Sequence, residues 1–460
     1  MLFHSQAFLL VFLPLVLAAY YLFGENRTVR SWALILASLV FYGYWDVRFV
    51  PLLVGSVCAN WIFARAFGRN PRAFVIIAGV ALNLFAIGLF KYFDFFADSI
   101  AAFTGWQHAP WNVILPLGIS FFTFQQISYL VDLRRSGAPV YSFADYALYV
   151  TFFPQLIAGP IVRHDEVIFQ YDASPLRDGL YERVSRGLVL FVAGLFKKVV
   201  LADNLALIAD PLFAAAAGGQ ALTLGEGWAA AGAFGLQIYF DFSGYSDMAI
   251  GLGLMFGLKL PFNFNAPYVA TSIRDFWRRW HITLSRFLRD YLYVPLGGSQ
   301  FGLARQVAAL LVTMLLGGLW HGAGWTFVGW GGLHGLALAV NHAWRRAGPR
   351  IPAAVGWIVT MSFVFLAWVL FRAETFAAAA DMWLSIAGGN GWSLSVQGVE
   401  RPWIIGVAAA MAMLGPTSQG IALERLVPRR AVAVTVAAAL VFMTLKVGGG
   451  DNAEFIYFQF

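Results

Sequence analysis

The sequence predicts an all-α protein that crosses a membrane many times. Of its 460 residues, 60% are hydrophobic and 12% are charged, whereas soluble domains carry about 25% charged residues. A soluble globule of this composition would expose large apolar patches. The apolar residues also gather in long runs separated by short polar loops, and a membrane helix needs roughly 17–25 such residues. We therefore expect a polytopic membrane protein with roughly 11–13 transmembrane or re-entrant helices.

The expected spans follow one another along nearly the whole chain. They lie near 6–23, 31–46, 50–67, 73–92, 114–131, 145–162, 187–208, 227–256, 304–320, 325–343, 352–371, 402–416 and 431–446. The first run lacks a basic leader and a small-residue cleavage pattern, so we expect a retained membrane segment. The run 227–256 is long enough to hold a break, and 257–303 is predicted to be re-entrant or interfacial.

The loop charges predict the orientation of the spans. Basic residues follow the first, third and fifth spans, at positions 27 and 30, 65 to 72, and 134 and 135, whereas the loop 94–112 has neither Lys nor Arg. By the positive-inside rule, the basic loops are cytoplasmic and the N-terminus lies outside the cytoplasm. The net charge of +7 is thus explained by basic loops at the cytoplasmic membrane surface, and we expect no nucleic-acid partner.

The chain is predicted to form a single membrane domain over 1–460, with its chemistry inside the membrane body. No internal repeat or linker marks a second domain, and the polar loop 163–186 is too short to form a catalytic one. The catalytic core is expected at approximately 114–343, followed by C-terminal helices in 352–460. Because Cys58 is the only cysteine and the histidines lack metal-ligand spacing, we expect no metal site.

A basic and aromatic segment over 273–290 has helical periodicity. Its apolar stripe consists of Ile273, Phe276, Trp277, Trp280, Leu284, Phe287 and Leu288. Arg274, Arg278 and Arg279 lie off that stripe, and His281 falls at the border between the two faces. Thr271 or Ser272 is the expected N-cap.

Two interpretations of this segment stay open at the level of sequence. It is either a surface helix that holds anionic lipid, or its arginines also guide a polyanionic donor, such as a CoA-type phosphate, into the membrane body. Asn263 lies just upstream beside other turn residues, and it either forms a turn or lines an entrance.

His321 lies in an apolar run between Trp320 and Trp325, with glycines at 317, 318, 322 and 324. An ionisable residue inside a membrane segment is a functional-site hypothesis by default. Glycines let helices approach closely or let the chain bend around a cavity. A buried imidazole is expected to be neutral near pH 7, and it can then take a proton from a hydroxyl or attack a thioester. The alternative is a histidine that only satisfies a neighbouring carbonyl.

Other polar groups interrupt apolar runs. Asp241 and Asp247 lie within 227–256, and an arginine from 274–289 is their expected partner unless they line a substrate path. Lys197 and Lys198 are expected to reach an interface with their charged ends. The aromatic stretch 455–460 is either an interface anchor or a segment that docks against the membrane body or a partner.

At His281 and His321 the chain resembles the membrane-bound O-acyltransferase family, and most closely its bacterial alginate O-acetyltransferase branch. The most specific matches are 277–285 (WRRWHITLS), 291–298 (YLYVPLGG) and 319–322 (LWHG). Further matches are 116–125 (PLGISFFTFQ), 153–161 (FPQLIAGPI), 241–245 (DFSGY), 368–373 (WVLFRA) and 455–460 (FIYFQF).

The resemblance implies membrane helices around a central tunnel, with His321 as the catalytic histidine and His281 as the second catalytic position. We expect substrate contacts from Trp277, Arg278, Arg279, Trp280, Asn263, Trp320 and Asp241. The resemblance also implies acetyl transfer in the bacterial inner membrane, from acetyl-CoA to a polysaccharide such as alginate, usually with SGNH-like periplasmic acetyltransferase partners. A D-alanyl or other acyl transferase with a carrier-protein donor, and a non-enzymatic transporter, are the alternatives.

Overall fold

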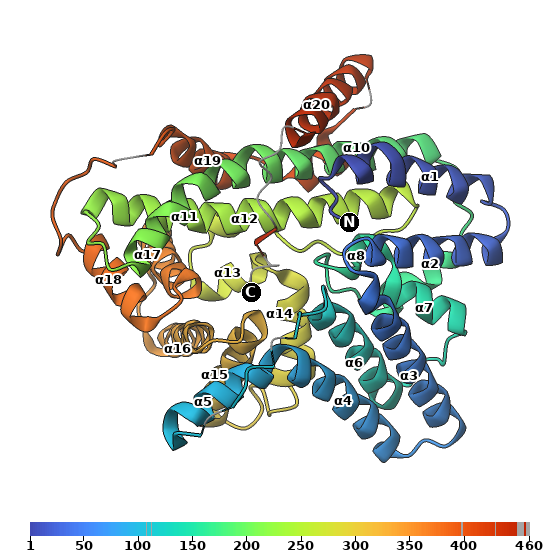
Figure 1. Ribbon diagram of the computed structural model, residues 1–460, viewed down its shortest axis with the longest axis horizontal. Coiled ribbons are helices and arrows are strands. Elements are labelled where there is room, and N and C mark those ends of the chain that lie inside the picture. The colour runs from blue at the N-terminus through green and yellow to red at the C-terminus, as the bar shows by residue number, and fades with distance from the viewer. Residues whose placement is uncertain (107, 112, 397–398, 428, 449–454, 457–460) are drawn as a thin grey trace. The chain divides into compact units, whose positions relative to one another are not determined.

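The computed structural model describes residues 1–106, 108–111, 113–396, 399–427, 429–448 and 455–456, and all the regular secondary structure in this part of the chain is helical. Two compact units form. Unit 1 comprises Met1–Ala193, Tyr245–Pro261 and Ala422–Gly450, and unit 2 comprises Gly194–Gly244, Phe262–Ile421 and Asp451–Phe460. Both units therefore combine segments that are far apart in the sequence (Figure 1).

Unit 1 consists mainly of the N-terminal helices. They are α1 (Leu13–Leu22), α2 (Arg27–Gly43), α3 (Val50–Arg69), α4 (Ala73–Ile87), α5 (Phe93–Thr104), α6 (Ile119–Arg135), α7 (Phe143–Thr151), α8 (Phe153–Leu156), α9 (His164–Val167), most of α10 (Leu180–Phe196), and α20 (Arg430–Gly448). Within it, α4 packs against both α3 and α6, and α2 packs against α7. A buried pair of side-chain amides, Asn60 on α3 and Asn83 on α4, joins two of these helices through reciprocal hydrogen bonds of 3.2 and 2.6 Å.

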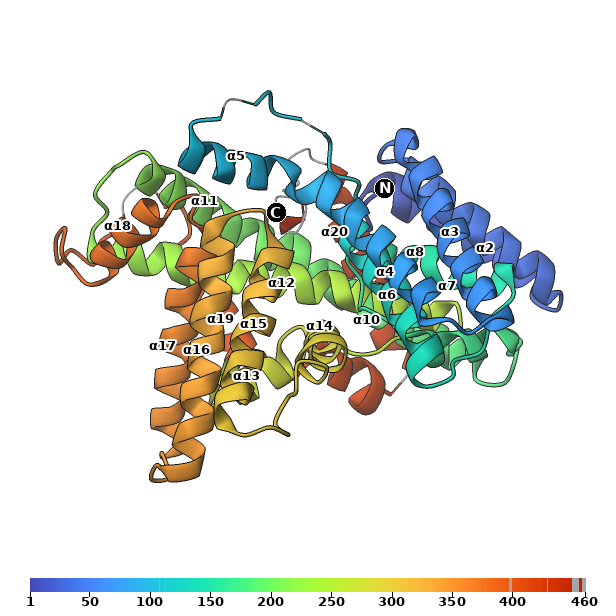
Figure 2. The same cartoon turned by 90° about the horizontal axis from the view of Figure 1, so that it is seen from below.

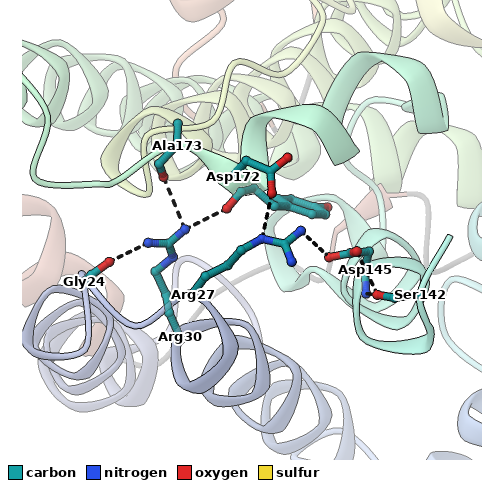
Figure 3. A network of polar contacts seen from close by, with 8 residues as sticks. Gly24, Arg27, Arg30, Ser142, Asp145, Asp172 and Ala173 are labelled. Atoms are coloured by element: carbon teal, nitrogen blue, oxygen red, sulfur yellow. Dashed lines mark hydrogen bonds and ion pairs between the residues drawn. The ribbon is translucent and has the colours of Figure 1, made fainter.

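Two arginines at the start of α2 hold the loops of unit 1 together. Arg30 is buried and donates to the carbonyl oxygens of Gly24, Tyr171 and Ala173 at 2.5, 2.7 and 3.2 Å. Arg27 pairs with Asp145 and Asp172, each at 2.8 Å. Figure 3 shows both guanidinium groups pointing at these acceptors from the same helix.

Unit 2 contains the other α-helices together with the π-helical turns η5 and η7. They are η5 (Lys197–Ala202), α11 (Asp203–Ala217), most of α12 (Leu224–Met255), α13 (Ile273–Arg279), α14 (Ile282–Leu288), η7 (Arg289–Tyr293), α15 (Leu303–His321), α16 (Trp325–Ala347), α17 (Ala353–Arg372), α18 (Phe376–Ile386) and α19 (Trp403–Leu414). The long helices α15, α16 and α17 pack side by side in that order (Figure 2). The short helices α13 and α14 pack against each other, and α13 also contacts α16.

The all-α membrane architecture predicted from composition is confirmed. Five helical stretches of the described chain are long and apolar enough to span a bilayer, namely Val47–Arg69, Ala73–Thr104, Leu303–His321, Ala353–Arg372 and Arg430–Gly448. Several other expected spans differ in detail. The break considered in 227–256 is absent, because α12 runs unbroken. The expected span 145–162 contains only the short helices α7 and α8, and α18 was not predicted.

Candidate active site

The segment 273–290 is not one helix, although its apolar stripe predicted one. Helix α13 ends at Arg279, Trp280 is extended, and His281 has the left-handed φ of +41° before α14 begins at Ile282. Such a conformation is uncommon for a residue other than glycine and often marks a functional site. Ser272 is the N-cap of α13, accepting from the Asp275 amide at 3.2 Å, which confirms one of the two predicted caps.

The break turns His281 into the interior, where its ring is completely buried. Its Nδ1 lies 3.0 Å from the side-chain oxygen Oδ1 of Asn263. The same oxygen also accepts hydrogen bonds from the backbone amide and the hydroxyl of Thr283. A side-chain carbonyl can only accept, so Nδ1 carries the hydrogen. Burial lowers the pKa of His281 to about 3, so the ring is neutral at pH 7 and Nε2 keeps its lone pair. Asn263 thus orients the imidazole rather than forming a simple turn.

His321 is the last residue of α15 and is almost completely buried. Its ring centroid lies 5.0 Å from that of Trp320, 5.2 Å from that of Trp330 and 5.2 Å from that of Phe371. Trp320 also lies 6.0 Å from the ring of His281. Both predicted histidines therefore contact the same indole. Trp325, the other tryptophan that flanks His321 in the sequence, is 53% exposed.

Glycines permit this arrangement by letting α15 and α16 approach closely. A methyl group on Gly331 would lie 2.1 Å from the Met314 carbonyl oxygen, and one on Gly318 would lie 2.2 Å from that of Phe327. Any side chain at either position would push the two backbones apart. Of the glycines expected near His321 to permit close approach or a bend, Gly318 is confirmed in the first role.

A cavity of about 910 Å³ lies in unit 2 beside α13–α16. Its lining includes six arginines, namely Arg274, Arg278, Arg286, Arg289, Arg345 and Arg346. Trp277 and the α15 residues Gln306, Thr313 and Met314 also line its wall. The sequence analysis found the arginines of 274–289 but missed Arg345 and Arg346, although their place at the end of an apolar run was a usable signal.

The cavity separates the predicted substrate contacts into two groups. Trp277 and Arg278 line it, whereas Arg279 pairs with Asp275 at 3.0 Å and Trp280 is buried against Phe276 and Tyr268. Asn263, Trp320 and both catalytic candidates are likewise absent from its lining. A tunnel from this cavity to the two histidines, which the family resemblance implies, therefore stays a prediction.

Ring contacts connect the cavity wall to His321 through a histidine that the sequence analysis did not single out. Trp277 donates from Nε1 to His334 Nδ1 at 3.2 Å. The completely buried His334 ring lies 4.6 Å from Trp330, which contacts His321. Along α15, His321 lies seven residues beyond the cavity-lining Met314, which is about 10 Å along a helix axis.

Asp241 has a different partner from the one predicted. Its carboxylate pairs with Lys198 at 2.9 Å and accepts from the backbone amide of Ile456 at 2.6 Å, rather than pairing with an arginine of 274–289. The expectation that Lys198 reaches an interface is also wrong, because its side chain is 3% exposed and also pairs with Asp203. Both expectations failed because a buried carboxylate on α12 provides a closer acceptor for the ammonium group.

The second carboxylate predicted on this helix, Asp247, is buried within unit 1. The terminal stretch 455–460 is described only at Phe455 and Ile456, both of which are buried in unit 2. Docking against the membrane body is therefore confirmed for these two residues. The other four lie outside the described residues.

The fold and site define a polytopic membrane enzyme with buried histidines and a basic cavity. Residues 119–378 match the sequence profile of MBOAT, the membrane-bound O-acyltransferase family. The chain is 42% identical to the peptidoglycan O-acetyltransferase of Helicobacter pylori, over 86% of this chain and 81% of that protein. It is 43% identical to the probable alginate O-acetylase AlgI of Pseudomonas aeruginosa, over 86% and 76% of the two chains, and 37% identical to that of Pseudomonas putida, over the full length of both.

The chain therefore belongs to the membrane-bound O-acyltransferase family, and it is an O-acetyltransferase of that family.

Proposed function

We propose that this protein takes acetyl groups from acetyl-CoA at the cytoplasmic face of the bacterial inner membrane. It delivers them for O-acetylation of an exopolysaccharide such as alginate, either directly or through a periplasmic acetyltransferase. The relatives named for alginate and peptidoglycan O-acetylation support a glycan acceptor. The alternation of basic loops with neutral or acidic ones supports an N-terminus on the periplasmic side.

The arginine-lined cavity is the observation that carries this proposal. Within the part of the chain that the structure describes, Arg274, Arg278, Arg345 and Arg346 pair with no carboxylate, although all four line the cavity. Unpaired guanidinium groups around a concave site favour a ligand with several phosphates, since each can form charge-assisted bonds with phosphate oxygens. Acetyl-CoA carries a diphosphate and a further phosphate at one end of a long, thin arm that ends in the thioester.

We assign the chemistry to His321, with the arm of the donor lying along α15 beyond Met314. His321 takes the proton from the acceptor hydroxyl as the oxygen attacks the acetyl carbonyl carbon. A new C–O bond forms, the thioester C–S bond breaks, and the proton passes from His321 to the departing thiolate. The products are an acetyl ester and free CoA thiol. A short-lived acetyl group on His321 itself is the alternative route.

The tautomer of His281 constrains its part in this reaction. With its hydrogen on Nδ1 held by Asn263, Nε2 can accept a hydrogen bond but cannot donate one. An Nε2 that carries no hydrogen therefore cannot donate to the donor carbonyl and polarise it. It can accept a hydrogen bond from a second hydroxyl of the glycan acceptor and so orient the acceptor while His321 takes the proton of the attacking hydroxyl, which is the role we propose.

The test uses purified protein in nanodiscs, radiolabelled acetyl-CoA and an alginate oligosaccharide, with CoA thiol release as a second readout. We expect His321→Ala to lower kcat by roughly 10²- to 10⁴-fold, the usual contribution of a general base, while its Tm stays unchanged. The control is His108→Ala in unit 1, which is expected to retain full activity. Full activity of His321→Ala would refute the catalytic assignment. Transfer from an acylated carrier protein but not from acetyl-CoA would refute the donor.

A further inference from the structure

The buried carboxylate of Asp241 joins two parts of unit 2 that are far apart in the sequence. Ile456 lies 215 residues after Asp241, yet its backbone amide donates to Asp241 Oδ2 at 2.6 Å. The side chains of Phe455 and Ile456 are 1% and 2% exposed. A carboxylate in such surroundings must be hydrogen-bonded or paired, and the amide of Ile456 meets part of that need.

Lys198 meets the rest. Its ammonium group lies 2.9 Å from Asp241 Oδ1 and 2.9 Å from Asp203 Oδ1, so one cation serves two carboxylates. It lies on η5, a π-helical turn, and such turns are frequent at functional sites. Gly244 allows the short reach, because a methyl group there would lie 2.7 Å from the Gly194 carbonyl oxygen. Close packing of α12 against the helix that carries Lys198 thus brings the two charges together.

The residue after Asp241 connects this pair to the histidine. The ring of Phe242 lies 6.1 Å from that of Phe455 and 4.7 Å from that of His281, edge to face in the second case. Phe242 therefore lies between the docked segment and the imidazole. If the segment 455–456 left its place, one side of the Phe242 ring would lose its support.

We propose that Asp241 and Lys198 act as positioning residues that hold the segment 455–456 against α12 and thereby fix the Phe242 ring on which His281 packs. This inference rests on the proposed function where activity is concerned. It replaces the expectation that Asp241 contacts substrate, because both of its oxygens already serve the fold. Loss of the pair then lowers kcat by misplacing His281, and leaves the donor cavity, and so the KM for acetyl-CoA, unchanged.

The first test measures docking without using activity. In a Cys58→Ala background, Ile456→Cys provides a single thiol whose backbone amide still reaches Asp241. We expect slow maleimide labelling in this parent protein and at least ~10-fold faster labelling after Asp241→Leu. The matched control is Asp203→Asn, which removes the other carboxylate on Lys198 and is expected to leave labelling slow. Equal labelling rates in the parent and in Asp241→Leu would overturn the proposal.

The second test is a double-mutant cycle on kcat. We expect Asp241→Leu and Phe455→Ala each to lower kcat by about 10-fold at unchanged KM, and the double variant to be no worse than the poorer single variant. Multiplication of the two effects would mean that Asp241 acts independently of the segment and would overturn the proposal. Lys198→Arg keeps the positive charge and is expected to retain activity, whereas Lys198→Met removes the charge and is expected to lose activity. An equal loss in both variants would also count against the proposal.

The outcomes of the two functional hypotheses are separable. Full activity in His321→Ala would refute the catalytic assignment but leave the labelling result intact. Conversely, an inactive His321→Ala variant combined with unchanged labelling in Asp241→Leu would refute only the positioning role. Asp241→Asn, which keeps one acceptor oxygen and nearly the same size, provides a folded variant if Asp241→Leu does not accumulate, and its labelling is expected to be intermediate.

Discussion

Two groups of arginines, one in each unit, have opposite surroundings. In unit 1, Arg30 donates to three carbonyl oxygens and Arg27 pairs with two carboxylates (Figure 3). In unit 2, Arg274 and Arg278 on α13 face a cavity together with Arg345 and Arg346 on α16. No carboxylate pairs with these four in the described chain. The first group is satisfied by the fold, and the second is available to a ligand.

The lowered pKa of Arg274 shows that its charged form is disfavoured among the other cavity arginines. Burial lowers the pKa of its guanidinium group, and the neighbouring Arg278 and Arg345 lower it further. Like charges held close together destabilise a fold unless something opposes them. A polyanionic ligand would oppose them here. Arginines that already pair with groups of the protein should thus contribute to stability. Arginines without such partners, which line the cavity, should contribute to ligand binding.

The largest effect that separates the groups is expected for Arg30→Met. Three carbonyl oxygens, two in buried hydrogen bonds and one in a partly buried hydrogen bond, would lose a charged donor, and hydrogen bonds to charged groups contribute about 1.5–3 kcal/mol each. We expect the free energy of unfolding to fall by about 3 kcal/mol or more, measured as a lower Tm in detergent. Arg48→Met is the control, because the side chain of Arg48 is 71% exposed and its partner within the described residues is Asp46, two positions earlier. An unchanged Tm together with a raised KM for acetyl-CoA would mean that Arg30 contributes to donor binding and not to the stability of the fold.

The next effect concerns binding. Replacing Arg274, Arg278 and Arg345 together by Gln is expected to raise the KM for acetyl-CoA by about 10- to 100-fold, equivalent to about 1.4–2.8 kcal/mol. The kcat should change little and Tm should not fall, because no internal partner is lost and the repulsion among these charges is relieved. Initial rates over a range of donor concentrations measure this. A fall in kcat at constant KM would mean that these arginines serve the chemistry rather than the docking of phosphates.

The sequence predicted the long helices well, because a bilayer imposes both their length and their composition. The spans expected at 304–320, 325–343 and 352–371 correspond to α15, α16 and α17 within a few residues. The failures lie where tertiary contacts overrule the local pattern. The stripe over 273–290 is a sound helical pattern, but the hydrogen bond from His281 to Asn263 and the left-handed backbone at 281 break it.

The candidate site was predictable only in part, for the same reason. His321 and His281 stand out because ionisable residues are costly in apolar surroundings. His334 has equally apolar neighbours, but its link to the cavity depends on Trp277, 57 residues away. The partners of Asp241 lie on η5 and at Ile456. No local periodicity indicates such pairings, because they are set by how the helices pack.

A smaller effect concerns ionic strength. Screening weakens the attraction between exposed charges, with a Debye length of about 10 Å at 0.1 M salt and about 3 Å at 1 M. We expect the KM of the unmodified protein for acetyl-CoA to rise several-fold between 0.05 and 0.5 M NaCl, as an order-of-magnitude estimate. The triple Gln variant should show a much flatter response. Parallel salt dependence in the two proteins would show that the cavity arginines do not attract the donor.

The smallest effect is expected for Arg27→Gln in unit 1. Its side chain is 43% exposed, and of its two partners Asp172 is 72% exposed. Exposed ion pairs contribute about 0–1 kcal/mol, because solvent screens the charges and the long side chains lose freedom on pairing. We expect a barely lowered Tm and an unchanged KM, measured beside Arg30→Met. A change in KM as large as that of the triple Gln variant would break the comparison, since an arginine already paired in unit 1 would then contribute to donor binding.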